Sequence, residues 1–161
     1  MLNDGWGRRI LALPEFNLAL FALLLNYPWE FIQIPFFEQM PTLPHGEAVL
    51  FCTRAALGDV LIALAAFWVV ALARGDRGWL RRPDRRAVLG FVAVGLLVTV
   101  GLEWHATEVA GRWHYSELMP TVPLLGTGLL PLLQWLLLPP LVVWFARRQI
   151  RGQEALRGDC R

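Results

Sequence analysis

The sequence predicts an all-α integral membrane protein, built as a single bundle of four transmembrane helices with both termini on the cytoplasmic side. Three observations lead to this prediction. Hydrophobic residues make up 56% of the 161 residues, and the mean hydropathy of +0.45 lies above that of a soluble globular domain. Four apolar segments are each long enough to cross a hydrocarbon core of ~30 Å, which takes about 20 helical residues. The third observation is that arginines gather in alternate loops.

The four predicted spans cover residues 16–37, 48–73, 87–104 and 128–146. They form one domain, residues 1–147, which a basic cytoplasmic tail follows at 148–161. Arg8 and Arg9 precede the first span as in a signal peptide, but the apolar run continues through 26–30 without a small-residue cleavage site. We therefore expect the first segment to be retained as a helix.

The arginines decide the predicted orientation. All fifteen basic residues are arginine, and short arginine-rich loops stay in the cytoplasm. Two arginines precede the first span, none lies in the loop 38–47, six lie in 74–86, one lies in 105–115 and five lie in 147–161. The sequence thus predicts an N-in, C-in, multi-pass protein of the bacterial cytoplasmic (inner) membrane.

Two connections have a distinctive composition. The loop 74–86 is rich in Arg, Gly and Pro, which predicts a solvated cytoplasmic connection with Trp79 and Leu80 at the membrane surface. The stretch 119–127 is apolar but rich in Pro and Gly. Such backbone survives at membrane depth only where protein or water satisfies its polar groups, so we expect a re-entrant or interfacial segment over the outer mouth of the bundle.

Composition also bounds the partners. The arginines flank apolar runs and do not line one face of a polar element, so nucleic-acid binding is not expected. Cys52 and Cys160 are predicted on opposite sides of the membrane, which argues against a disulfide. Neither a phosphate-binding glycine loop nor a nucleophile motif is present, and no cofactor is expected. The expected partners are membrane lipids, a lipid-soluble small molecule, and a second copy or another membrane protein.

Polar residues inside the predicted spans fall mainly in the outer half of the membrane. A charged side chain that faces lipid costs several kcal/mol, so we expect these side chains to turn inward and form one cluster. The cluster consists of Glu30, Gln33, Arg54, Asp59, Glu103 and Gln134. In an alternative interpretation, Gln33 and Gln134 serve only as interhelical hydrogen-bonding residues.

The first span carries a polar stripe. Asn26, Glu30 and Gln33 are spaced i, i+4 and i+7, which places them on one side of a helix. This stripe is predicted to face the bundle. Pro28 and Pro35 each remove a backbone donor, and we expect them to bend the helix around a cavity.

The second span carries an acid and a base. Asp59 lies near the middle of the membrane, where an unpaired carboxylate is disfavoured and the neutral, proton-donating form is favoured. Arg54 lies about 140° from Asp59 around the helix, so it is expected to pair with Glu30 or Glu103. In an alternative interpretation, Glu30 and Arg54 form a purely structural ion pair.

The predicted outer loop is rich in aromatic and titratable residues. His105 and Glu108, at i and i+3, match no zinc spacing, so no metal site is predicted. Arg112, Trp113 and Tyr115 follow. The aromatic residues either anchor the loop at the membrane interface or form a wall that stabilises a cation or holds a flat, apolar ligand.

Part of the chain resembles a group of membrane enzymes. An acid, an alanine, a Gly-x-Trp-x-Tyr motif and a proline-containing helix occur in an order similar to that of membrane lycopene cyclases and related carotenoid-modifying proteins. The acidic pair that those families carry after the proline is replaced here by Leu and Gln. The resemblance implies an isoprenoid-like substrate, whereas the rest of the chain resembles bacterial multi-pass membrane proteins without an assigned activity. The matching residues, within 103–140, are Glu103, Ala106, Gly111, Trp113, Tyr115, Pro131 and Gln134.

Three functions fit this pattern. The first is an enzyme that protonates or hydrates a double bond of an isoprenoid-like lipid, with Glu30, Asp59 and Glu103 as catalytic acids. The others are a small-molecule or proton carrier and an accessory or assembly subunit, so whether the chain is an enzyme stays open. The residues expected to bind the ligand are Asn26, Gln33, Arg54, Arg112, Trp113, Tyr115 and Gln134.

Overall fold

The computed structural model describes residues 7, 10–123 and 125–158, and it confirms the predicted all-α fold. Short 3₁₀ turns and one π-helical turn, η4 (His105–Val109), join the long helices. In the described part of the chain the only β-type pairings are two isolated bridges. The four long helices are α2 (Pro14–Ile32), α3 (His45–Arg74), α4 (Arg85–Trp104) and α5 (Leu129–Gly158).

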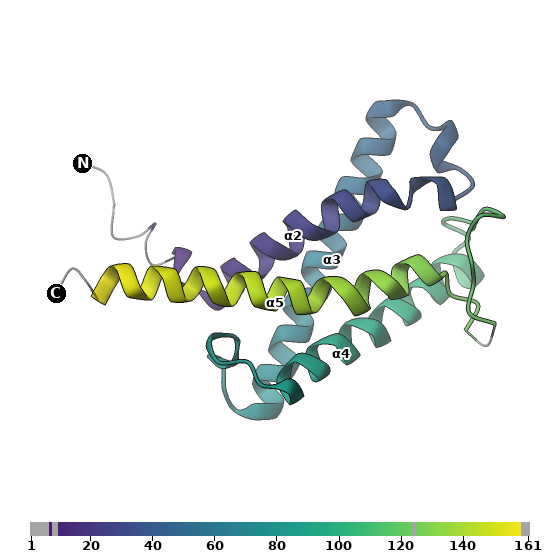
Figure 1. Cartoon of the computed structure of the whole chain (residues 1–161). Helices are drawn as coiled ribbons and strands as arrows, with labels where there is room; N and C mark the ends of the chain where they lie inside the picture. Colours follow the sequence, from purple (N-terminus) through teal and green to yellow (C-terminus); the bar gives the residue numbers. More distant parts are fainter. Residues whose placement is uncertain (1–6, 8–9, 124, 159–161) are drawn as a thin grey trace.

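The connections alternate between the two ends of the bundle. Figure 1 shows the start of α2, the end of α5 and the α3–α4 loop toward the left, and the α2–α3 and α4–α5 connections on the right. The arginine-rich and arginine-poor loops therefore lie at opposite ends, as the alternation of arginines requires. Following the predicted orientation, we call the end with the α3–α4 loop (75–84) the inner end and the opposite end the outer end.

Three helices are long and apolar enough to cross a membrane. They are α3 with 30 residues, α4 extended by η4 to Val109 with 25, and the segment of α5 from Leu129 to Leu156 with 28. The 19 residues of α2 correspond to ~28 Å of helix, close to the thickness of a hydrocarbon core. α2 is not among these three helices, and its buried face carries Asn17, Asn26 and Glu30. Three of the four predicted spans are thus confirmed by length and composition.

Prolines and a cap set the helix boundaries. The first predicted span continued to residue 37, which is wrong: α2 ends at Ile32, and Pro35, which has no N–H to donate, lies in a 3₁₀ turn after it. Pro28 is accommodated within α2. The carboxylate of Asp84 caps α4 by accepting a 2.8 Å hydrogen bond from the backbone N–H of Ala87.

The last helix continues beyond its predicted end at residue 146. α5 runs unbroken through Pro139 and Pro140 to Gly158, so the basic segment is helical over most of its length. Ala146 and Ile150 are both buried in the inner-end core, and this burial continues the apolar face of the helix past the predicted span.

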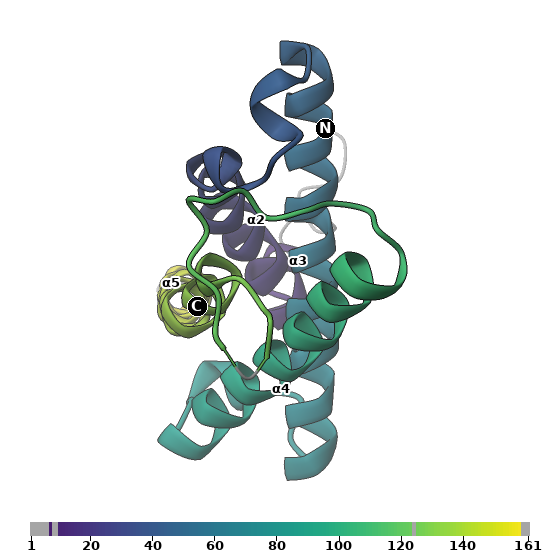
Figure 2. The same cartoon turned by 90° about the vertical axis from the view of Figure 1, so that its right-hand side faces the viewer.

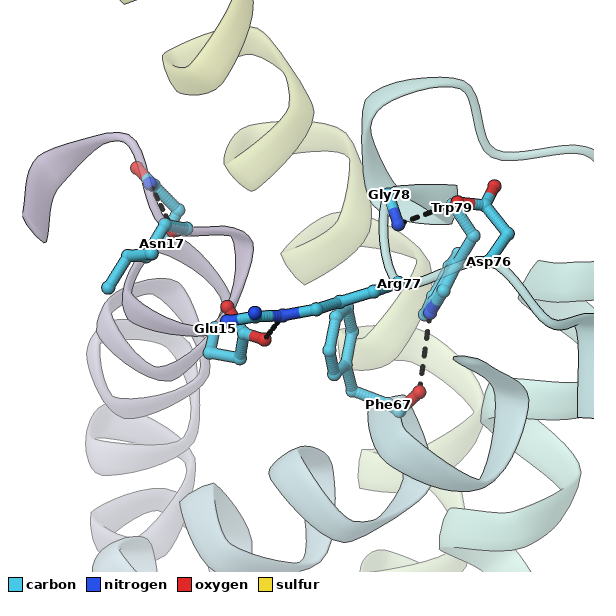
Figure 3. Close-up of polar contacts among 8 residues, drawn as sticks. Glu15, Asn17, Phe67, Asp76, Arg77, Gly78 and Trp79 are labelled. Carbon is cyan, nitrogen blue, oxygen red and sulfur yellow. Dashed lines mark hydrogen bonds and ion pairs between the residues drawn. The ribbon is translucent and has the colours of Figure 1, made fainter. Parts of the chain in front are cut away.

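The α3–α4 loop folds back under the bundle. Trp79 and Leu80 are only 1% and 0% exposed, so their predicted place at the membrane surface is wrong. The indole Nε1 of Trp79 donates to the carbonyl oxygen of Phe67 at 3.3 Å, and the two rings stack with centroids 5.5 Å apart (Figure 3). Burying a tryptophan removes a large apolar surface from water, and the cost of burying its N–H is offset when that group has a hydrogen-bond partner. Both conditions are met at Trp79, which explains its inward position.

Ion pairs fasten the same loop. Figure 3 shows Arg77 in contact with Glu15 at the start of α2. Arg77 Nε lies 2.7 Å from the Glu15 carboxylate. Arg81 pairs with Glu154 of α5 at 3.0 Å, and Arg74 at the end of α3 pairs with Asp84 at 2.7 Å. The arginine-rich loop is therefore tied to three helices.

The stretch 119–127 packs across the outer end, as predicted. Figure 2 looks onto this end and shows the connection from α4 to α5 crossing it. Met119 is buried with Phe37 and Cys52, and the backbone N–H of Val122 donates to the carbonyl oxygen of Thr127 at 3.0 Å. Met119 thus packs the connection against α3 and the segment that follows α2, and the Val122 hydrogen bond closes a turn within the connection.

Candidate functional site

A cavity with a volume of about 450 Å³ lies at the outer end, between all four long helices and the α4–α5 connection. Its volume falls within the range of small-molecule sites in proteins, roughly 300–1,000 Å³. Each helix contributes at least one polar side chain to the wall. These polar lining residues are Glu30, Gln33, Cys52, Arg54, Asp59, Thr99, Glu103, Arg112 and Gln134.

The ten residues predicted to form a site lie together. Eight of them line the cavity: Glu30, Gln33, Arg54, Asp59, Glu103, Arg112, Trp113 and Gln134. The other two, Asn26 and Tyr115, are hydrogen-bonded to residues of the wall.

Gln134 of α5 is the centre of the acidic part. Its side-chain nitrogen Nε2 lies 2.8 Å from Asn26 Oδ1, 3.1 Å from Glu30 Oε1 and 2.8 Å from Asp59 Oδ2. An amide nitrogen carries two hydrogens, so three acceptors converge on two protons. Oxygens from α2 and α3 are therefore brought to one point by a side chain of α5.

The polar stripe of α2 faces this point. Asn26, Glu30 and Gln33 are 5%, 7% and 5% exposed. Asn26 donates from Nδ2 to the backbone carbonyl of Ala22 at 2.8 Å, which directs its oxygen toward Gln134. Helical spacing alone places these side chains on one face, and packing against α3 and α5 buries that face.

Glu103 forms a second acidic position at the end of α4. Its Oε2 accepts a short hydrogen bond from the hydroxyl of Tyr115 and a longer one, at 3.4 Å, from Trp113 Nε1. The indole of Trp113 packs edge-on against Phe37 and Phe51, with ring centroids 6.4 and 6.2 Å away. Two residues of the outer connection thus orient this carboxyl group.

Burial and the nearby carboxylate raise the pKa of Tyr115 above its usual value. Both effects disfavour the phenolate, because the charged form loses hydration and meets a second negative charge. Tyr115 therefore remains a hydrogen-bond donor to Glu103 at neutral pH.

The predicted ion pair of Arg54 with Glu30 or Glu103 is wrong. Both carboxyl groups accept hydrogen bonds from neutral donors, and in the described part of the chain no carboxylate lies within ion-pair distance of Arg54. Arg54 lines the cavity together with Arg112, which has no ion pair among these residues either. The two cations and three acids of the cavity therefore occupy separate positions.

Two lining residues, Thr99 and Trp135, were not singled out from the sequence as site residues. Thr99 precedes Glu103 by one helical turn, and Trp135 follows Gln134, so their spacing was an available signal. The atoms Thr99 Oγ1, Trp135 Nε1 and Gln33 Oε1 are buried without a hydrogen-bond partner among the described residues. Such groups favour a ligand with polar atoms of its own.

Other reactive residues lie outside any metal-like arrangement. Across the described ranges, no group of three or more His, Cys, Asp or Glu side chains is placed to hold a metal ion. Cys52 is a buried free thiol that donates to the carbonyl of Glu30 at 3.7 Å. Cys160, for which no disulfide was expected, lies outside the described residues.

The fold and the cavity define an all-helical protein with three helices of membrane-spanning length and an acidic site at one end. Comparison with protein-family models, with curated proteins and with solved structures finds no match for this chain. The site is therefore interpreted from its own geometry, and the resemblance over 103–140 stays a prediction.

Proposed function

We propose that the protein is an enzyme of the bacterial cytoplasmic membrane that acts by acid chemistry on a double bond of a lipid-soluble, isoprenoid-like substrate. One observation carries the proposal. Glu30 and Asp59, from different helices, meet at one amide nitrogen on the wall of a cavity large enough for a ligand.

Two carboxyl groups that contact the same amide nitrogen favour sharing one proton, because two negative charges side by side repel strongly where water is excluded. The protonated carboxyl group acts as the general acid that gives a proton to the substrate. The ionised carboxylate acts as the base that takes a proton from the substrate. Gln134 supplies the donor that stabilises the carboxylate left after proton transfer.

The reaction balances without a cofactor. Proton transfer from the Glu30–Asp59 pair to an alkene carbon forms a C–H bond and leaves a carbocation and a carboxylate. Loss of a proton from a neighbouring carbon, to that carboxylate or to Glu103, gives a rearranged alkene. Addition of water, whose oxygen bonds to the cation and whose extra proton passes to the same carboxylate, gives an alcohol. The aromatic faces of Trp113 and Trp135, which line the cavity, can stabilise the intermediate cation.

Lipid analysis tests the proposal. Total lipid extracts are compared by mass spectrometry from strains with the gene deleted, restored, or restored as Glu30→Gln or Asp59→Asn at matched protein level. Glu108→Gln is the control, because Glu108 is an exposed acid outside the cavity lining. A lipid that accumulates in the deletion and in both site variants, but not in the control, supports the enzyme. Identical extracts from all strains would refute it.

A second candidate is an accessory subunit in which the cluster only holds the bundle together. The hydrogen bonds of Gln134 favour it, because they join α2, α3 and α5. In that case Glu30→Gln and Asp59→Asn reduce the amount of folded protein and leave the lipids unchanged. A carrier, the third function considered, is favoured by the acids that line the cavity and would show acid-dependent ligand or proton movement in liposomes.

A further inference from the structure

We propose that Arg54 and Arg112 bind a phosphate-type anion at the polar end of an amphipathic lipid whose apolar chain occupies the cavity. The inference rests on the proposed function in taking the cavity as a substrate site. It adds that the substrate is an anionic, amphipathic lipid and that its anionic end lies at the two arginines.

Arg54 of α3 and Arg112 of the α4–α5 connection both line the cavity, and both residues are exposed. The backbone of Arg112 is fixed on both sides. Its N–H donates to the carbonyl of Ala106 at 2.9 Å, and its carbonyl accepts from Gln39 Nε2 at 3.4 Å. Gly111, with φ of 55°, makes the turn that precedes it. The position from which this side chain extends is therefore set by the fold.

The acids of the cavity form no ion pair with these two arginines. Gln134 donates hydrogen bonds to Glu30 and Asp59, and Tyr115 donates one to Glu103. The ion pairs found among the described residues all lie at the inner end. Two arginines at the outer end are thus left for an external anion, and an unpaired guanidinium along a membrane helix is costly. Their planar donor forks match the oxygens of a phosphate group.

The rest of the wall indicates an amphipathic ligand. Ile34, Phe37, Phe51, Ile62 and Leu102 contribute apolar surface that an inorganic phosphate would leave uncovered. A chain attached to the anion would cover it.

The helix also fixes the order of the two sites. Asp59 follows Arg54 by five residues, which is ~7.5 Å along α3. The acid pair therefore lies deeper along α3 than the backbone of Arg54, on the side that the apolar chain of the lipid would occupy.

Equilibrium binding tests the inference with protein in phosphatidylcholine nanodiscs. The probes are a radiolabelled C15 prenyl diphosphate, the prenyl alcohol of equal length and inorganic diphosphate. The diphosphate lipid should bind roughly tenfold or more tightly than the alcohol, since charge-assisted hydrogen bonds supply that difference. Inorganic diphosphate should bind weakly. Equal affinity for the two prenyl compounds would overturn the inference.

Substitutions assign the preference to the two arginines. Arg54→Gln and Arg112→Gln should each weaken diphosphate-lipid binding roughly tenfold and leave alcohol binding unchanged. Arg82→Gln is the control, because Arg82 is exposed on the inner loop and has no ion pair among the described residues. An equal loss in the control, or no loss in either site variant, would contradict the inference.

A phospholipid headgroup offers the same chemistry, so a further comparison separates the two sources. Phosphatidylglycerol added to the nanodiscs displaces the prenyl diphosphate if the site takes a phospholipid, and leaves it bound if the site selects the isoprenoid. Both results keep the anion site. Binding requires no turnover, so unchanged lipid extracts would refute the enzyme and leave this site standing, whereas loss of anion preference would leave the acid chemistry standing.

Discussion

Glu30 of α2 and Asp59 of α3 accept hydrogen bonds from one atom, Nε2 of Gln134, at 3.1 and 2.8 Å. The same atom also lies 2.8 Å from the side-chain oxygen of Asn26. One amide on α5 therefore connects three helices and sets the separation of two acids. Its loss should affect the fold and the chemistry together, so the two effects have to be measured separately.

Replacing Gln134 by leucine should lower the free energy of unfolding by about 1–3 kcal/mol, because buried acceptors lose their donor. The measurement is unfolding in mixed micelles of increasing SDS fraction, followed by circular dichroism. Gln153→Leu is a matched control on the same helix, since Gln153 Oε1 has no hydrogen-bond partner among the described residues. Equal midpoints for the two variants would show that the Gln134 contacts do not stabilise the bundle.

Gly95 of α4 lies against the indole of Trp135, and a Cβ at this position would overlap the ring. Gly95→Ala should therefore displace Trp135, narrow the cavity and destabilise the protein by about 1–3 kcal/mol. Gly101→Ala, on the same helix with nothing near its added carbon, should be neutral or stabilising by about 0.5–1 kcal/mol. The same unfolding assay compares the two. A Gly95→Ala protein as stable as Gly101→Ala would mean that the indole moves aside without cost.

Tyr115 should ionise only at a pH well above the ordinary tyrosine value of about 10, because burial and Glu103 raise its pKa. Tyr27 is the only other tyrosine, so a Tyr27→Phe background isolates the signal. The ultraviolet absorbance of tyrosinate is followed during titration with base. Glu103→Gln, which removes the neighbouring charge, should shift the transition toward lower pH. Ionisation near the ordinary value in the parent would contradict the geometry.

The sign of the Tyr115 effect on stability follows from the same shift. A group whose folded pKa lies above its unfolded pKa stabilises the fold fully below the unfolded value, about pH 10, and loses this contribution as the pH rises further. Wild-type protein should therefore lose stability above about pH 10 more steeply than Tyr115→Phe. Parallel curves in alkaline unfolding experiments would exclude this contribution.

Asp84 gives the opposite pH dependence at the inner end. The hydrogen bond from the N–H of Ala87 and the neighbouring Arg74 lower the pKa of this carboxyl group. Its contribution is present above the unfolded value of about 4 and is lost as the pH falls through the lower folded value. Asp84→Asn should therefore reduce the loss of stability on acidification. Glu117→Gln, an exposed acid on the outer connection, is the control, and equal acid profiles for both variants would argue against a role for the cap.

Helical spacing and the cost of charge in lipid were sufficient to predict which faces turn inward. Asn26, Glu30 and Gln33 follow one another at helical intervals, and the structure buries all three. Asp59 and Gln134 lie on other helices, but each had to avoid lipid and the interior of the bundle was the only alternative. The cluster could therefore be assembled from the sequence without knowledge of the packing.

The pairings within the cluster could not be predicted, because they depend on how far each helix is displaced along its neighbours. Arg54 was expected to form an ion pair with Glu30 or Glu103. Instead, Gln134 of α5 donates to Glu30 and Tyr115 of the outer connection donates to Glu103. Trp79 was expected at the membrane surface because a loop sequence does not reveal whether it folds back into the core. Pro35 did carry a local signal for the early end of α2, since it cannot donate a helical hydrogen bond.

The crossing of the membrane by α2 can be tested by cysteine labelling. In a background with Cys52→Ala and Cys160→Ser, single cysteines replace Leu11, before α2, and Gly46, at the start of α3; Leu11 is exposed and Gly46 has open space around its added carbon. A membrane-impermeant maleimide applied to spheroplasts should label the cysteine at position 46 directly.

The cysteine at position 11 should react only after permeabilisation, because α2 separates the two sites by ~28 Å of helix and the arginine-rich loops are predicted to face the cytoplasm. Arg82→Cys, on the inner loop, provides the reference for a cytoplasmic position. Labelling of both outer and N-terminal positions in intact spheroplasts would show that α2 lies along the outer surface. Protection of position 46, with labelling of positions 11 and 82, would show that the whole bundle is inverted and that the cavity opens to the cytoplasm.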